Sequence, residues 1–531
     1  MPVGWVLVAV LAACAQPLAT TAGEASSEAR APFPYQLLFP AIANASEGAA
    51  RHDLPAVALL AHGHDVRPPK ARLLAHEGFV CFRSPVVAAL RAGQVHGWCA
   101  RMRQPHSQPR QTPALTPATL PNEQVLVTLV EGRRLSCDEH GGPHQVLLRV
   151  SSDAGRTWGQ HAVLVSDQSF RDFGPQDSFR NPTPVVHRGA GQGAESLVVL
   201  FNRIPGHLNS VHQALQRADA RETWVIRGTL VGDAGRMEWS VPVNATASVQ
   251  HEHGTLFAVS NSVGVEVELN SPPGGMRLIV SAEEGTLSNL HFACDSQRAT
   301  CRSTWHGLLL LSDDGGRSWR RGARLPAGTR EVRLGAARGR MGVIGAGWTE
   351  HGRPEGQVVV ASLRTLWPCE GHALEDLLFW VQVQKEQPPT HCRAMAWSYD
   401  GGDSLVALRD TPHHFHKGHY QDSPLDPGIG AALLATNAGR ILIAAQVLST
   451  SKDYPLTLSV SRDAGLNWSA PLSIWPHTAG PVSIARAAGD ALVAVFEGSP
   501  RGIQCNHPFE EAVGACGIVE VRVRERDAVL R

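Results

Sequence analysis

A short turn motif recurs along the chain, and it constrains the fold more than any other sequence feature. Three full copies read SSDAGRTW (151–158), SDDGGRSW (312–319) and SRDAGLNW (461–468). Two weaker copies, VGDAGRMEW and SYDGGDSL, begin at 231 and 398, so consecutive copies start 63 to 86 residues apart. Each copy follows a strand-like run such as QVLLRVS or LTLSVS. A repeat of this kind predicts one β unit that is used several times.

The chemistry of the motif predicts a tight turn between two antiparallel strands. Aspartate accepts hydrogen bonds from turn amides, glycine supplies a positive φ, and tryptophan packs beneath the turn. The 51 glycines and 36 prolines suit short strands and tight turns better than helices. A chain of 531 residues is also long enough to bury a large core.

The repeat resembles the Asp-box, and several Asp-boxes at this spacing resemble a six-bladed β-propeller of the sialidase type. The resemblance implies an all-β fold, a six-bladed β-propeller of four-stranded antiparallel blades with Asp-box turns. We expect it to occupy 71–531, with a disordered insertion rich in Pro, Gln and Thr at 100–124 in the first blade. No role is assigned to 23–70.

The first 22 residues are expected to be a secretory signal peptide, because the apolar run 6–15 suits such a signal and is too short to span a bilayer. Three glycosylation sequons, at Asn44, Asn244 and Asn467, agree with this expectation. No other segment is apolar enough to be transmembrane. The secretory pathway, ending in the lysosomal lumen or outside the cell, is therefore the expected location.

The charge of the chain argues against polyanionic partners. Formal net charge is +0, from 48 basic and 48 acidic side chains, so neither nucleic acid nor an anionic membrane is expected as the main partner. No cysteine or histidine spacing suggests a metal site, and no cofactor is expected.

An arginine stands inside the apolar strand GFVCFRSPVVAAL (78–90). Such a buried charge must be paired, either with a carboxylate of the protein or with one of a ligand. Sialidases begin their first blade with a Phe/Tyr-Arg-Ile-Pro strand whose arginine binds the sialic acid carboxylate. CFRSPVV matches it apart from Ser84, so the resemblance assigns carboxylate binding to Arg83. FRNPTPVV at 179 and NRIP at 202 are rival matches, and they fit the opening strand of the second blade and a later strand.

The next segment, VLVTLVEGRRLSCDEHGG (125–142), resembles the AxAEGR…DE strand and loop of the family. Only the Arg83 strand precedes this segment, which is why Arg83 is preferred over its rivals. By resemblance, Arg133 contacts the substrate, with Arg134 as its rival. Asp138 is the acid/base, with Glu139 as the alternate.

The resemblance also implies a glutamate that activates a tyrosine nucleophile. Glu370 is favoured for that glutamate because it precedes the turn at 398 in the right order. Glu331, 12 residues beyond Trp319, is the alternative.

Several expected groups are not found at the positions that the resemblance assigns. The second clamp arginine should end the strand after the helper glutamate, and the third should stand shortly before LTL at 456. The nucleophile should lie in the segment TAGPVSIARAAGD. The residues at these positions are Val383 (or Ala346 or Gly347), Asp453 beside Lys452, and Pro481. The chain holds only four tyrosines: Tyr35, Tyr399, Tyr420 and Tyr454.

Three hypotheses follow for function, and the least specific of them is a structural propeller with neither a catalytic nor a binding role. The first is a sialidase-family glycoside hydrolase that removes terminal sialic acids from glycoproteins, glycolipids or oligosaccharides by a retaining mechanism. The alternative is a degenerate propeller that binds sialylated glycans or a protein partner without turnover, in which Arg83 pairs with an internal carboxylate such as Asp453. The resemblance covers most of 78–531 and is closest to the lysosomal-type sialidases of animals, which work with a carboxypeptidase partner.

Overall fold

The structure is a computed structural model, and almost every regular element in it is a β-strand. It describes residues 35–40, 81–91, 124–134, 143–170, 172–188, 195–206, 221–231, 236–250, 255–269, 275–286, 306–327, 329–339, 356–365, 393–407, 431–447, 455–477, 479–498 and 517–529.

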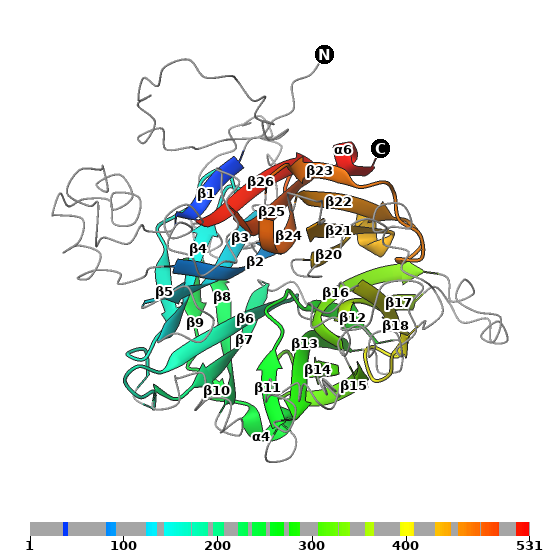
Figure 1. Cartoon of the computed structure of the whole chain (residues 1–531). Helices are drawn as coiled ribbons and strands as arrows, with labels where there is room; N and C mark the ends of the chain where they lie inside the picture. The colour runs from blue at the N-terminus through cyan, green and yellow to red at the C-terminus, as the bar shows by residue number, and fades with distance from the viewer. Residues whose placement is uncertain are drawn as a thin grey trace, which may run out of the picture.

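Six antiparallel sheets are arranged around a common centre as the blades of a propeller (Figure 1). Four of the sheets have four strands, and the sheets of the second and third blades have five. The all-β, six-bladed prediction is therefore confirmed. The strands of blades one to three are β2 (Cys81–Arg91), β3 (Gln124–Arg133), β4 (His144–Ser151) and β5 (Ala162–Val165); β6 (Ser178–His187), β7 (Ser196–Ile204), β8 (Glu222–Val231), β9 (Arg236–Trp239) and β10 (Val243–Asn244); β11 (Thr255–Val259), β12 (Val265–Glu268), β13 (Met276–Thr286), β14 (His306–Ser312) and β15 (Arg320–Ala327).

Blades four to six follow in chain order, and the last one also takes a strand from the other end of the chain. Their strands are β16 (Thr329–Gly339), β17 (Gly356–Thr365), β18 (Arg393–Ser398) and β19 (Val406–Ala407); β20 (Ala431–Thr436), β21 (Ile441–Val447), β22 (Leu456–Ser461) and β23 (Leu472–Trp475); β24 (Ala479–Ala487), β25 (Ala491–Gly498), β26 (Gly517–Arg524) and β1 (Tyr35–Pro40). Short helices α4 (Thr246–Val249) and α6 (Glu525–Val529) and the 3₁₀ turn η8 (Asn437–Gly439) complete the described elements.

Strand β1 closes the ring by pairing with β26, at the outer edge of the sixth blade. Its residues fall within 23–70, to which the sequence assigned no role. The sixth blade therefore joins the first described strand of the chain to the last one (Figure 1).

The apolar core is divided among the seams between blades. The described buried residues form six clusters, and each cluster draws its members from the facing sheets of two neighbouring blades. Apolar residues alternate along each strand, so that one side of a blade packs on the preceding blade and the other side on the next. No single core holds the protein together, because the stability is spread over six similar seams.

Four of the repeated turns, at 151, 312, 398 and 461, adopt one hydrogen-bonded structure, whereas most of the turn that begins at 231 lies outside the described residues. In the copy at 312–319, Ser312 Oγ donates to Asp314 Oδ1 and accepts from the backbone N–H of Gly316, and Asp314 also accepts from Ser318 N and Oγ. Burial opposes the charge of Asp314, yet these bonds outweigh burial and lower its pKa to about 2. Equivalent bonds hold the copies with aspartates 153, 400 and 463.

The glycine of each of these four turns also lies against the preceding blade. Gly316 has φ +83°, and a Cβ placed there would lie 2.8 Å from Val198 Cγ1 on β7. Gly465, with φ +91°, is similarly close to Met395 on β18. The motif therefore needs glycine for two reasons, the left-handed conformation and the close approach of the neighbouring blade.

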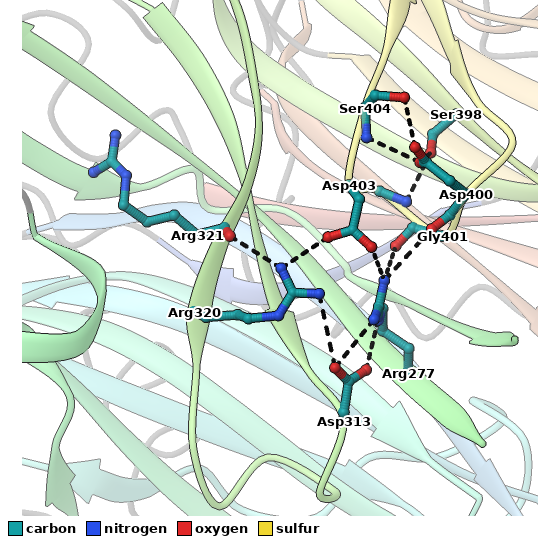
Figure 2. Close-up of polar contacts among 10 residues, drawn as sticks. Arg277, Asp313, Arg320, Arg321, Ser398, Asp400, Gly401, Asp403 and Ser404 are labelled. Carbon is teal, nitrogen blue, oxygen red and sulfur yellow. Dashed lines mark hydrogen bonds and ion pairs between the residues drawn. The ribbon is translucent and has the colours of Figure 1, made fainter. Parts of the chain in front are cut away.

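A charged network joins two of these turns (Figure 2). Arg277 on β13 donates to Asp313 Oδ1 (2.5 Å) beside the third-blade turn, and to Asp403 Oδ2 (2.7 Å) in the fourth-blade turn. Arg320 reaches Asp403 Oδ1 at 2.8 Å. Burial disfavours the charge of Arg277, but the bonds to the two aspartates outweigh it and raise its pKa. This network ties blade three to blade four at the end that bears the turns.

Replacing Gly316 by alanine should therefore destabilise the propeller. A left-handed non-glycine residue and the contact with Val198 together should cost about 2 kcal/mol or more of the free energy of unfolding. Chemical denaturation measures this change. Gly275→Ala is the matched control, because its added Cβ meets nothing within 4 Å. Equal stability of the two variants would show that the turn tolerates a side chain.

The seam that closes the ring contains a buried carboxylate. Glu520 on β26 is only 2% exposed, and its Oε2 accepts a 2.5 Å hydrogen bond from Trp158 Nε1 in the first-blade turn. Burial raises the pKa of Glu520 to about 7, although Trp158, Arg522 and Arg149 favour its charged form and Asp153 disfavours it. The interface between the sixth and first blades thus contains a group that titrates near neutrality.

The stability of the protein should consequently fall as pH rises through this interval. Folding raises the pKa of Glu520, so the folded state binds a proton that the unfolded chain releases above about pH 4.5. The contribution is complete below that pH and is lost as pH rises through about 7. We expect a loss of up to about 3 kcal/mol between pH 5 and 8, measured as the difference between wild type and Glu520→Gln. Parallel pH profiles for the two proteins would contradict this assignment.

Candidate functional site

The first-strand arginine lies at the end of the propeller opposite to the repeated turns. Ser84 N–H donates to Glu497 on β25, beside the start of β24, and further along β2 Val87 N–H donates to Ser483 Oγ on β24. Strands β2 and β24 therefore run in the same direction. Strand β4 also runs in this direction, and it ends at Ser151, where the first repeated turn begins. Arg83 stands near the start of β2, at the other end.

The guanidinium group of Arg83 forms an ion pair with a carboxylate of the protein. Its Nε lies 2.7 Å from Glu497 Oε2 at the end of β25, and the other oxygen, Oε1, accepts the Ser84 backbone N–H at 2.7 Å. Ser84 has φ 57°, and the pairing of β2 with β3 shifts between Arg83 and Val86. Glu497 is 2% exposed, whereas the Arg83 side chain is 21% exposed. The buried carboxylate therefore fixes both the strand bulge and one edge of the guanidinium group.

The same arrangement recurs between the first and second blades. Glu131, 1% exposed, accepts the backbone N–H of Asn181 at 2.7 Å through Oε1, and Asn181 has φ 54°. Its other oxygen, Oε2, accepts from Arg133 Nη2 at 3.1 Å. Arg134, the rival of Arg133, faces the neighbouring strand instead, where the oxygen of the Gln145 amide accepts from its guanidinium. The two arginines thus have different surroundings, and Arg133 belongs to the Glu131 cluster.

A third copy lies between blades three and four. Glu331, with φ 45°, donates its backbone N–H to Glu283 Oε2 at 3.4 Å, and the Arg330 side chain contacts both oxygens of Glu283 at 3.3 Å. The Glu331 side chain accepts from Arg364 Nη1 at 2.5 Å. Arg364 stands near the end of β17, which is the strand that pairs with β16.

Arg364 is a candidate site residue that the sequence analysis did not identify. The resemblance requires an arginine at the end of the strand after the helper glutamate, and for Glu331 the sequence indicated Ala346 or Gly347 at that position. The strand paired with the Glu331 strand is Gly356–Thr365 instead, and it places Arg364 against Glu331. The β-branched run VVVASLRT was the available signal.

Arg333, two residues beyond Glu331, holds three blades together. It is 6% exposed, and it donates to the backbone carbonyls of Ala431 (2.8 Å), Ser260 (2.6 Å) and Asn261 (2.9 Å). Burial lowers its pKa, although Glu331 and Glu283 favour the charged form. A buried cation bonded to carbonyl oxygens in this way stabilises the backbone next to Glu331.

Several predicted residues lie outside the described parts of the chain. Asp138 and Glu139 follow β3, which ends beside the start of β2, and the structure describes neither. Glu370, Val383, Ala346, Gly347, Lys452, Asp453, Tyr420 and Tyr454 also lie outside the described residues. Their assignments therefore stay predictions, as do those of Arg133 and Arg134 as substrate contacts.

The expected nucleophile position holds no tyrosine. Strand β24 reads AGPVSIARA, and Pro481 lies where its pairing with β25 shifts. Of the tyrosines that the structure describes, Tyr35 is on β1, at the opposite edge of the same sheet. Tyr399 follows β18 at a repeated turn, where burial raises its pKa. Neither of these two tyrosines stands on an innermost strand.

The fold and the arginine-bearing end define a propeller of the sialidase type. The chain is similar to a sialidase of Micromonospora viridifaciens, with 26% identity over 220 residues, 41% of this chain. It spans only 30% of that relative's length. No protein-family model matches the chain.

Solved structures of sialidases share the fold. The Hadza microbial sialidase Hz136 has a TM-score of 0.55 at 13% identity, over 85% of this chain and 67% of that protein. Trypanosoma rangeli sialidase with the inhibitor DANA has a TM-score of 0.52 at 14% identity, over 85% and 56% of the two chains. The resemblance to the sialidase family is thus confirmed, whereas the lysosomal-type animal assignment stays a prediction.

Within the described residues, no helix has the length and apolar character needed to cross a membrane. The same part of the chain holds no group of three or more metal-ligating side chains.

Removing the Glu131 carboxylate should weaken the protein strongly. Glu131→Ala leaves the buried Arg133 guanidinium and the Asn181 N–H without this acceptor, and loss of one partner from a buried pair costs about 3–5 kcal/mol. Denaturant unfolding measures the change. Glu238→Ala, at an exposed position on β9, is the control and should change stability by about 0.5 kcal/mol at most. Similar losses in the two variants would refute the role given to Glu131.

Proposed function

We propose that the chain is a sialidase-fold glycoside hydrolase that removes terminal sialic acids from glycoconjugates by a retaining mechanism. The observation that carries the proposal is the Arg83–Glu497 pair, which holds a partly exposed guanidinium at the end of the propeller opposite to the repeated turns. A guanidinium has five N–H donors in a planar fork, so the contact of its Nε with Glu497 is compatible with a ligand carboxylate on another edge. The sialidase relatives support the choice of sialylated glycans as substrates.

Glu331 and Arg364 support a catalytic role for the fourth blade. The resemblance places the second clamp arginine at the end of the strand after the helper glutamate, and Arg364, near the end of β17, contacts Glu331 at 2.5 Å. Glu370 remains the other candidate for the glutamate. In the proposed reaction, Asp138 donates a proton to the leaving oxygen and then activates water.

A second candidate function is binding of sialylated glycans or a protein partner without turnover. Pro481 favours this second candidate, because it stands where the resemblance places the nucleophile. A retaining reaction needs a nucleophile, and a proline side chain has no nucleophilic group. Under this alternative the internal carboxylate that pairs with Arg83 is Glu497, and the remaining donors of the guanidinium group bind the carboxylate of a sialylated ligand. For both candidate functions, we propose that the protein acts in the lysosomal lumen or outside the cell.

The test is hydrolysis of a fluorogenic α-sialoside at acidic pH by the secreted full-length chain. If the chain is a sialidase, Arg83→Ala should lower kcat/KM about 30-fold or more, because a buried charge-assisted contact is lost. Glu331→Gln and Glu370→Gln identify the helper glutamate by the larger fall in kcat. Arg462→Ala, an exposed arginine in a repeated turn, is the matched control and should retain activity.

Absence of turnover combined with sialic acid binding that Arg83→Ala abolishes would support the second candidate. Absence of both turnover and binding would refute the hydrolase proposal and the glycan-binding form of the second candidate.

A further inference from the structure

The outer edge of the second blade exposes apolar side chains. Strands β9 and β10 both pair with β8, and no other described strand pairs with β10, which lies on the outer rim of the ring (Figure 1). Val241 is 72% exposed and Val243 is 50% exposed, and Val163 is the one other large apolar residue that is exposed in the described part of the chain. An open strand edge with exposed valines favours association with another chain unless a further group covers it.

The sequon Asn244-Ala-Thr stands on this same edge. Its backbone is fixed to β8, because Ala245 N–H donates to Thr223 O at 2.8 Å and Thr246 Oγ1 accepts from Thr223 N–H at 2.9 Å. Asn244 is exposed, and its Oδ1 accepts from Thr246 N–H at 2.9 Å. No described residue accepts a hydrogen bond from Asn244 Nδ2. The amide nitrogen of this sequon is therefore available on the outside of the blade.

The second sequon that the structure describes has a different environment. Asn467 Nδ2 donates to Asp463 Oδ2 at 2.6 Å within the fifth-blade turn. In the first and third blades, the hydroxyl groups of Thr157 and Ser318 make the equivalent bond. Asn467 therefore supplies a donor on which its turn depends, whereas Asn244 Nδ2 has no such task. The third sequon, at Asn44, lies outside the described residues.

We propose that Asn244 carries an N-linked oligosaccharide, and that this glycan covers the outer edge of the second blade and the two valines beside it. In the transfer, Asn244 Nδ2 forms a bond to the anomeric carbon of the first sugar of a lipid-pyrophosphate-linked oligosaccharide. The bond from that carbon to the phosphate oxygen breaks, the lipid pyrophosphate leaves with the electron pair, and Nδ2 loses one proton. A bulky polar glycan solubilises the surface to which it is attached.

The inference rests on the proposed location, because this transfer takes place in the lumen of the endoplasmic reticulum, and it is independent of any catalytic activity. The full-length chain is expressed in cultured mammalian cells, and protease protection in isolated microsomes reports whether it enters the lumen. Mass spectrometry of glycopeptides then reads each sequon. Wild type should carry a glycan at Asn244, and Asn244→Gln should lack one oligosaccharide. Asn467→Thr is the matched control, because threonine keeps a hydroxyl donor for Asp463, and it should leave the Asn244 glycan unchanged.

Sedimentation velocity of the purified proteins tests the covering role. Asn244→Gln should self-associate at a concentration about tenfold lower than wild type, because burial of two valines between chains is then unopposed. Asn467→Thr should behave as wild type. Replacing Val241 and Val243 by threonine in the Asn244→Gln protein should reverse the association, and thermal unfolding of each variant shows that it is folded.

A chain that enters the lumen with Asn244 unmodified would overturn the proposal. Equal self-association of wild type and Asn244→Gln would overturn the covering role of the glycan, as would an association that the two threonine substitutions do not reverse. A chain that protease protection places outside the lumen would instead refute the proposed location on which the proposal rests.

Discussion

A buried carboxylate that accepts a backbone N–H from the next blade is the interaction on which the arginine-bearing end of the propeller depends. Glu497, Glu131 and Glu283 each make this contact, and each partner is a residue with positive φ at a bulge of an innermost strand. The conformational strain at each bulge, about 1–3 kcal/mol, needs such support to persist. The carboxylate thus performs two tasks, because it holds the strained backbone and orients a guanidinium group.

The two ends of the propeller are built on different principles. At one end, serine, aspartate and glycine form compact turns whose bonds are mostly local, and Arg277 adds a link between two of them. At the other end, buried carboxylates accept backbone N–H groups of innermost strands that are distant in sequence. The first arrangement stabilises the blades, and the second leaves charged groups where an acidic ligand can meet them.

The sequence predicted the fold well because the turn motif is local. The side-chain bonds that define it join residues two to four positions apart, so its spacing alone indicates repeated blades. Arg83 was also identifiable, since an arginine in an apolar strand demands a partner. Its partner was not, because Glu497 lies 413 residues away from Ser84 and nothing in VFEG distinguishes it from an ordinary strand end. Asp453, the internal partner suggested by the sequence, lies outside the described residues.

The pairing of Arg364 with Glu331 could not be predicted for a similar reason. The segment between their two strands is long and contains another apolar run, GVIGAG, which is a nearer candidate for the paired strand.

The position of β1 has a consequence for biosynthesis. This strand leaves the ribosome before all the other described strands, yet its hydrogen-bonding partner β26 is among the last segments to be made. Until then it has an unpaired edge, which is the kind of surface that aggregates or recruits chaperones. Blades one to five can form as they are synthesised, but the sixth can be completed only after translation has passed residue 524. A chain truncated within the last blade would therefore carry an open ring and an unpaired first strand.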